Sequence, residues 1–345
     1  MAVAFILKIS GQVREVGGHW KEKLARLDPL GNLLFLPAVV CLLLALQWGG
    51  SEYAWGSATI IALFVLSAVL FALFVGDQVW SGENATIPLR VARRRSTITA
   101  SVFSLFLLAS YLGMIFYLPI WFQAIQDVSA VNSGLRCLPS MLSVVVFSIV
   151  SGASVKMLNR YVPFAIASSI LTAIGAGLMT TFTVDEPASR WIGYQVIFGA
   201  GVGLGVQIGV VAVQTRLETH DIAVGIAIVS FCQYLGATVT LAVYQSIFNN
   251  TFLAELAKLA PGAVATFQQG VGATDLRNIT DPAHYEMVRE AYHESLTRCW
   301  FIFVGLAAAS ALGAFAMEWR PIQAKEEDPG NGVDGADSKS PEEAR

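Results

Sequence analysis

Eight long windows without a charged residue constrain the fold of this chain more than any other feature of its sequence. Each holds about 20 largely apolar residues, with no Asp, Glu, Lys or Arg in its interior. A helix needs about 20 such residues to cross a hydrocarbon core about 30 Å thick. The windows are too long and too uniformly apolar for strands or for the core helices of a soluble protein. We therefore predict membrane-spanning helices at approximately 30–48, 55–76, 98–122, 137–155, 162–183, 191–214, 223–247 and 299–317.

The composition also indicates that lipid surrounds most of the chain. Of its 345 residues 55% are hydrophobic and 14% are charged, whereas about a quarter of the residues in ordinary globular proteins are charged. The net charge of −3 gives no indication of a nucleic-acid partner. We predict an all-α, polytopic membrane protein embedded in the lipid bilayer.

The positions of Lys and Arg predict the orientation, because positive loops stay on the cytoplasmic side. These residues precede the first span and follow the second, fourth and sixth, whereas the short loops after spans one, three and five hold only Arg136 and Arg190. Both chain ends are then cytoplasmic and the segment 248–298 lies outside. We expect the plasma membrane, with a vacuolar or vesicle membrane as the alternative. An outside placement makes Asn278 in "NIT" and Asn249 in "NNT" candidate glycosylation acceptors.

The chain lacks the usual residues of a membrane-embedded catalytic centre. Ionisable groups inside a bilayer are costly and normally mark the chemistry, and the windows contain no acid, base or metal-binding cluster. The histidines lie in polar segments, so no pair of haem ligands is available. The cysteines are far apart, without C-x-x-C spacing, and are expected to be packing residues: Cys41, Cys137, Cys232 and Cys299. We expect no cofactor, no metal and no enzymatic activity, but a carrier for a bulky, partly apolar small molecule.

The stretch "FGAGVGLGVQIG" at 198–209 has the glycine content of a phosphate-binding loop, but its glycines are never in G-x-G-x-x-G register and no strand precedes them. On one continuous helix these residues would form two faces. The face predicted to pack against a neighbouring helix holds Gly201, Gly205 and Gly209. The opposite face, which we predict to line a transport path, with helix packing as the alternative, holds Gln195, Gly199, Gly203, Gln207 and Gln214.

Two further groups are candidates for the same path. In the seventh span a polar stripe about 80° wide contains Ser230, Gln233, Thr240 and Tyr244. At the outer end of the third span, Tyr117 and Trp121 lie one helical turn apart. An interfacial aromatic belt is the favoured interpretation of this second pair, and contact with a solute is the alternative.

Outside the windows the chain divides into segments. We predict a cytoplasmic segment 1–29, two spans with a basic loop at 30–97 and six spans at 98–317. Asp281 and Pro282 form a helix-start signal in the outer loop 248–298, so we expect a short external helix leading into the last span. The acidic tail 318–345 has too few apolar residues to build a core and is expected to be disordered.

Several strings of this sequence resemble the fungal members of the fourteen-span drug/proton antiporter group of the major facilitator superfamily, which includes the HC-toxin and aflatoxin efflux pumps. The resemblance runs almost end to end. It is carried by "LDPLGNLLFLPAVVCLLLALQWGG", "FYLPIWFQAIQDVSAVNSGLRCLP", "RWIGYQVIFGAGVGLGVQIGVVAVQTRL", "GIAIVSFCQYLGATV", "GATDLR" and "MEW".

The resemblance implies both an architecture and a function. Spans one and two would be the linker helix pair between two bundles, and spans three to eight the C-terminal six-helix bundle. The opening "MAVAFILKI" would be the end of the last helix of an N-terminal bundle. Gly225, Gln233 and Gly236 match the motif of the group, with Gly225 and Gly236 as helix-packing residues. The implied function is proton-coupled efflux of toxins, secondary metabolites or drugs, with a truncated, inactive fragment of such an exporter as the alternative.

Overall fold

The fold consists almost entirely of helices. The computed structural model describes residues 28–50, 52–82, 85, 87–259, 261, 285–319 and 321. Within these residues the β structure amounts to one isolated bridge between Gly49 and Tyr53, and eight helical segments are long and apolar enough to cross a membrane. The predicted all-α, polytopic class is therefore confirmed. The elements are α3 (Pro29–Trp48), α4 (Ala58–Ser81), α5 (Leu89–Ala92), α6 (Arg95–Gln126), α7 (Ala130–Arg136), α8 (Leu138–Leu158), α9 (Val162–Met179), α10 (Ala188–Gly205), α11 (Ile208–Arg216), α12 (Ile222–Leu259) and α15 (Tyr285–Ala316).

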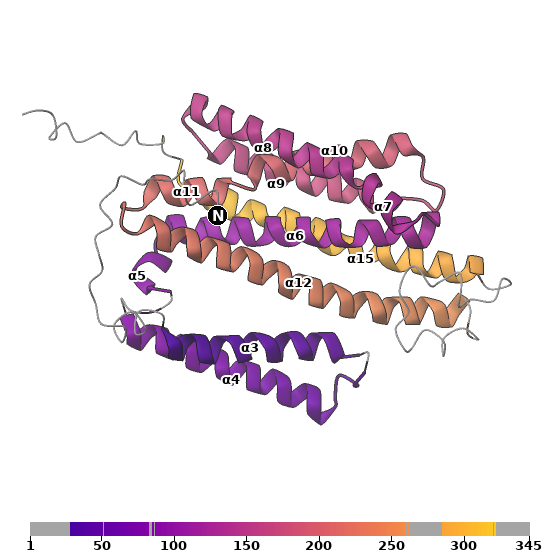
Figure 1. The fold of residues 1–345 in the computed structure, drawn as a ribbon, viewed down its shortest axis with the longest axis horizontal. Helices are drawn as coiled ribbons and strands as arrows, with labels where there is room; N and C mark the ends of the chain where they lie inside the picture. Colours follow the sequence, from indigo (N-terminus) through magenta and orange to yellow (C-terminus); the bar gives the residue numbers. More distant parts are fainter. Residues whose placement is uncertain are drawn as a thin grey trace, which may run out of the picture.

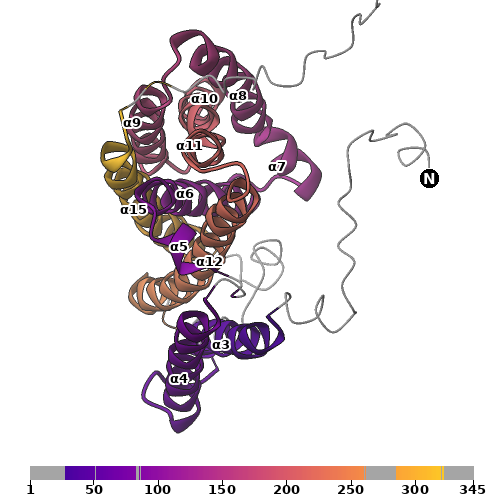
Figure 2. The same ribbon diagram turned by 90° about the vertical axis from the view of Figure 1, so that its left-hand side faces the viewer.

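The long helices run side by side in two groups. α6, α8, α9, α10 with α11, α12 and α15 form a six-span bundle, and α3 with α4 forms a separate pair next to α12 (Figure 1). Figure 2, turned by 90°, shows the pair attached to one side of the bundle. We call the end where α6 begins and α8 ends the inner end, and the opposite end the outer end, following the predicted orientation.

Two spans are longer than their apolar windows. α12 continues to Leu259 and α15 begins at Tyr285, so the predicted outer segment 248–298 is helical at both of its ends. The expected external helix is continuous with the last span, because polar side chains do not interrupt the backbone hydrogen bonds of a helix. The predicted start at Asp281 lies outside the described residues.

Local sequence explains where several helices begin and end. α8 has a proline in its first turn, where the missing N–H of proline has no hydrogen bond to lose. Asp127 follows the end of α6 and Asn159 follows the end of α8, both with left-handed backbone (φ 51° and 54°). Asn and Asp tolerate this conformation better than other non-glycine residues do. The sequence analysis did not predict these helix ends, because it located the spans by hydropathy alone.

α6 lies at the centre of the bundle. In its most apolar window 61% of the residues are buried, against 17% in α3 and in α4. Small residues allow α15 to approach α6 closely: a Cβ added to Gly113 would meet the ring of Phe303, and one added to Gly313 would lie 2.7 Å from the Cα of Phe103. Helices associate through such small residues in lipid, where the hydrophobic effect does not drive them together.

The α3–α4 pair contacts α12 of the bundle near the outer end and at a second point further in. Near the outer end, Ser246 Oγ on α12 donates to the Gly49 carbonyl (3.3 Å). Further in, the Phe35 ring on α3 lies 5.0 Å from that of Phe231 on α12. The two contacts with α12 hold the pair beside the bundle. Near the inner end, the Gln78 amide of α4 donates to the Asp28 carboxylate at the start of α3 (2.7 Å), which joins the two helices of the pair to each other.

Candidate transport pathway

α10 packs against α8 through the glycine face that the sequence assigned to a transport path. A Cβ added to Gly199 would lie 2.8 Å from Ser143 Cβ, and one added to Gly203 would lie 2.6 Å from the Val144 carbonyl oxygen. In this conformation the two glycines therefore border α8 and not an open space. The packing alternative describes their surroundings here, and a role in transport stays a prediction.

Serine hydroxyls of α8 strengthen the same crossing. Ser143 Oγ donates to the Val196 carbonyl (2.8 Å) and Ser151 Oγ donates to the Leu204 carbonyl (2.7 Å), both on α10. These hydrogen bonds lie on either side of Gly203 along the helix. They fix the distance between the two backbones at the glycine contact.

The second glycine face packs on α9 and α6. A Cβ on Gly201 would lie 2.6 Å from Thr172 Oγ1, and one on Gly205 would lie 2.8 Å from Ser168 Cβ, both on α9. Gly209, on α11, faces Ser104 of α6. α10 thus lies between α8 and α9, with one glycine face toward each.

The sixth span is not one continuous helix, and here the structure corrects the sequence analysis. α10 ends at Gly205 and α11 begins at Ile208. Glycine is the weakest helix former after proline, and kinks occur where glycines weaken the backbone ladder. The predicted stripe of three glutamines assumed one unbroken helix; Gln195 lies on α10 before the interruption and Gln214 on α11 after it, so a shared stripe stays a prediction.

The three glutamines have different surroundings. Gln195 is fully buried, and its side-chain amide donates to the Arg136 carbonyl (2.9 Å). Its Oε1 has no hydrogen-bond partner among the described residues. Gln207, at the break, and Gln214, on α11, are exposed. Gln195 thus connects α10 to the end of α7, whereas the other two could contact a solute or another protein segment.

The stripe on α12 is partly buried. Ser230, Gln233 and Thr240 are half-buried, but Tyr244 is fully buried. The glycines of this helix contact apolar side chains: Gly225 faces Leu217, and Gly236 faces Leu105 of α6.

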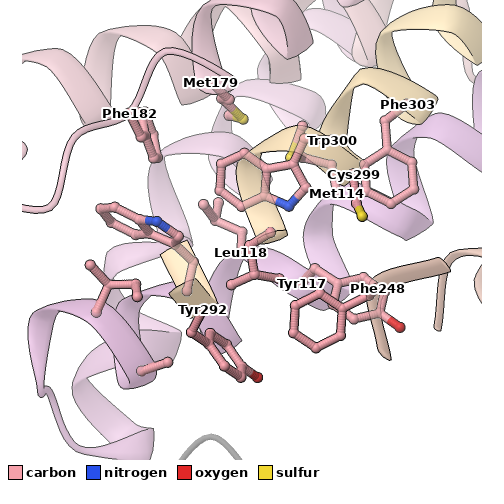
Figure 3. Close-up of a cluster of buried hydrophobic side chains, with 14 of the residues drawn as sticks. Met114, Tyr117, Leu118, Met179, Phe182, Phe248, Tyr292, Cys299, Trp300 and Phe303 are labelled. Atoms are coloured by element: carbon pink, nitrogen blue, oxygen red, sulfur yellow. The ribbon is translucent and has the colours of Figure 1, made fainter. Parts of the chain in front are cut away.

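Tyr117 and Trp121 lie inside the bundle, so the favoured belt interpretation is wrong for these two residues. Their relative exposures are 3% and 0%, whereas a belt residue faces the lipid headgroups. Tyr117 packs on Tyr244, with ring centroids 3.9 Å apart, and Trp121 packs on Phe182 at 4.9 Å. Figure 3 shows the aromatic and sulfur-containing side chains that surround them, drawn from α6, α9, α12 and α15.

Gln245 is a polar residue of this region that the sequence analysis missed. It accepts a hydrogen bond from the Tyr117 hydroxyl (2.6 Å), and its amide donates to the Asn249 side chain (3.1 Å). Both partners had been singled out separately, and Gln245 follows the buried Tyr244 directly. Asn249 lies within α12, and its glycosylation stays a prediction. Asn278 lies outside the described residues.

A polar cleft of about 430 Å³ opens at the outer end. Its charged lining residues are Arg136, Asp185, Glu186 and Arg289, two positive and two negative. The Arg136 guanidinium lies 5.9 Å from the Trp191 ring centroid, a favourable cation–π distance. Formal charges therefore balance in this cleft, and it does not favour an ionic ligand of either sign.

The inner end carries the basic residues. Arg90, on α5, forms a two-pronged ion pair with Asp221, just before α12, at 2.6 and 2.7 Å. The hydrogen bonds and positive charge of Arg90 lower the pKa of the Asp221 carboxyl. Arg216 lies 3.9 Å from Glu318. In the described ranges no cluster of His, Cys, Asp and Glu could hold a metal ion.

Comparison with known proteins shows similarity to membrane transporters. A model of the Major Facilitator Superfamily matches residues 28–241. The chain is 42% identical to the MFS-type efflux pump MFS1 of Trichophyton rubrum over 95% of this chain and 61% of the pump. It is 44% identical to the MFS acetylaranotin efflux transporter ataA of Aspergillus terreus over 86% of this chain and 66% of that protein. The chain thus spans about three fifths to two thirds of these relatives.

A solved structure supports the same fold. The structure is that of a bacterial homologue of the human lysosomal transporter Spinster, in an inward-facing and occupied conformation. The match covers 87% of this chain and 66% of the bacterial chain. The TM-score is 0.52 and the sequence identity is 16%, so this likeness concerns the fold alone.

Proposed function

Because the chain belongs to the major facilitator superfamily, we propose that it functions in the export of bulky, partly apolar small molecules such as toxins, secondary metabolites or drugs. The observation that carries this proposal is identity of about 40% with curated fungal efflux pumps over most of the chain. The relatives' names mention efflux, and one names acetylaranotin. The solute of this chain is proposed only as a chemical class.

The side chains of the bundle suit such a solute. Gln207, Gln214 and Gln233 offer neutral amides at exposed or half-buried positions. Neutral amides and hydroxyls among apolar groups can orient a large solute without requiring a charge on it. The break between α10 and α11 adds a point where the span can bend, and discontinuous helices often occur at the substrate sites of transporters. We place the path along these faces of α10, α11 and α12.

Export by alternating access involves the rocking of one bundle against another. The described residues comprise one six-span bundle and the α3–α4 pair, so we propose that residues 1–345 insert into a membrane but export nothing by themselves. We further propose proton coupling and a plasma-membrane location with both chain ends in the cytoplasm. The positive residues at the inner end support this orientation.

Accumulation of rhodamine 6G, a bulky and partly apolar dye, provides a test in yeast cells that lack their own drug pumps. We expect no reduction of dye by residues 1–345. If the transcript encodes further spans in frame before Met1, we expect reduction by that longer product, weakened by Gln207→Ala. Unchanged accumulation by the longer product across a panel of apolar toxins would contradict the exporter proposal. Dye export by residues 1–345 that is lost with Gln207→Ala would contradict the need for a second bundle.

A further inference from the structure

Two neighbouring arginines at the inner end have no partner among the residues that the structure describes. Arg93 and Arg94 connect α5 to α6, and both are exposed. In the part of the chain that the structure describes, neither guanidinium group makes a hydrogen bond or an ion pair. The charge of Arg94 acts on the Asp221 carboxylate, but both oxygens of Asp221 already accept hydrogen bonds from Arg90.

The backbone that carries these two arginines is anchored on both sides. Before them, Val91 is 1% exposed, and Arg90 is held by Asp221, whose side chain is 5% exposed. After them, the Arg95 guanidinium donates to the Ala316 carbonyl at the end of α15 (3.0 and 3.2 Å). Arg90 and Arg95 thus hold this segment to the bundle, and Arg93 and Arg94 lie between them on an anchored backbone.

This corner lies at the expected depth of the lipid headgroups. α6 begins at Arg95, and Trp80, one residue before the end of α4, is 84% exposed. Tryptophan is enriched at the boundary between hydrocarbon and water. Ile98, one turn into α6, is 48% exposed. A ligand bound here would meet two cations at its head and an apolar surface along its tail.

We propose that residues 89–94, the α5 corner, form a binding site for the phosphate headgroup of anionic phospholipids, with Arg93 and Arg94 as the headgroup ligands. Arginine matches phosphate with parallel N–H donors. The apolar surface beyond the corner favours a phospholipid over inorganic phosphate or a nucleic acid, neither of which has an acyl chain. The site sets a preference for the charge of the surrounding lipid, which is separate from the choice of solute.

Native mass spectrometry of the 345-residue chain in non-ionic detergent tests this site without reference to orientation. The probes are phosphatidylserine and phosphatidylcholine with identical acyl chains. We expect tighter binding of phosphatidylserine, because a basic residue near an anionic lipid surface contributes about fivefold in affinity. Arg93→Gln with Arg94→Gln should therefore weaken phosphatidylserine binding by about 30-fold and phosphatidylcholine binding by a smaller factor, because phosphatidylcholine carries the same phosphate but no net charge. Each single variant should lose about fivefold.

Lys156→Gln with Arg160→Gln is the matched control. Both residues are exposed near the inner end and the change removes the same charge, but they lie outside the α5 corner. We expect less than a twofold loss. Equal losses in the two double variants, unchanged phosphatidylserine binding in the Arg93 and Arg94 variants, or competition by inorganic phosphate at the concentration of the lipid would each overturn the proposal. The single variants decide the matter if the double variant does not fold.

Discussion

Gly203→Ala tests whether the α8–α10 crossing is a close packing contact or the edge of a path. The added methyl carbon would lie 2.6 Å from the Val144 carbonyl oxygen, 2.9 Å from Phe147 Cβ and 3.1 Å from Ser148 N. The closest of these is about 0.4 Å short of 3.0 Å, a separation that real Cβ contacts essentially never go below. Two of the three atoms belong to the α8 backbone, so no flexible side chain can relieve the clash by changing rotamer.

The expected loss of stability in Gly203→Ala depends on the contacts that α8 loses if it moves away from α10. Overpacking of this kind costs about 1–3 kcal/mol. A shift of α8 away from α10 would also lengthen the hydrogen bonds from Ser143 and Ser151, which are 2.8 and 2.7 Å long and contribute about 0.6 kcal/mol each in a membrane protein. We therefore expect the free energy of unfolding to fall by about 1–3 kcal/mol. A shift of α8 reduces the steric overlap but weakens the serine hydrogen bonds, so the two costs do not both apply in full.

Gly193→Ala is the matched control on the same helix, since a Cβ at Gly193 would meet nothing within 4 Å. Both substitutions improve helix propensity by about 1 kcal/mol, so that contribution cancels between them. Thermal unfolding of the two variants in detergent should give midpoints that differ by about 1–4 °C, with Gly203→Ala lower. Equal midpoints would refute the packing argument and favour an open space beside Gly203.

Two further predictions concern polar contacts. Tyr117→Phe removes the hydroxyl that donates to Gln245 (2.6 Å), so unfolding in detergent should show a loss of about 1 kcal/mol; Tyr234→Phe, at a position 64% exposed, should show none, and equal effects would contradict a role for this hydrogen bond. Asp221→Asn should destabilise the chain at neutral pH. Since the pKa of Asp221 is lowered in the folded chain, its contribution is present above the unfolded value of about 4 and is lost as the pH falls through the lower folded value. The difference in unfolding midpoint between the wild-type chain and Asp221→Asn should therefore shrink below about pH 4, and a constant difference down to pH 2 would disprove this link.

Patterns that depend only on neighbours along the chain were predictable. The spans follow from hydropathy, because a bilayer admits long apolar helices whatever their tertiary arrangement. The glycine spacing at Gly201 and Gly205 indicated a close helix contact before any partner was known. The family resemblance led to the same fold, and the matching family confirms it. Gln245 was missed because its importance comes from Tyr117, 128 residues away in the sequence.

The sequence by itself determined that the chain is a set of apolar helices with glycine faces and basic inner loops, since these properties are local. Only the tertiary structure decided what each face meets. Gly199 and Gly203 face α8, Tyr117 and Trp121 point inward, and Arg90 pairs with Asp221. Helix periodicity fixes which residues share a face, but the identity of the facing helix depends on contacts between distant segments. The interruption of the sixth span after Gly205 was likewise not visible in that periodicity.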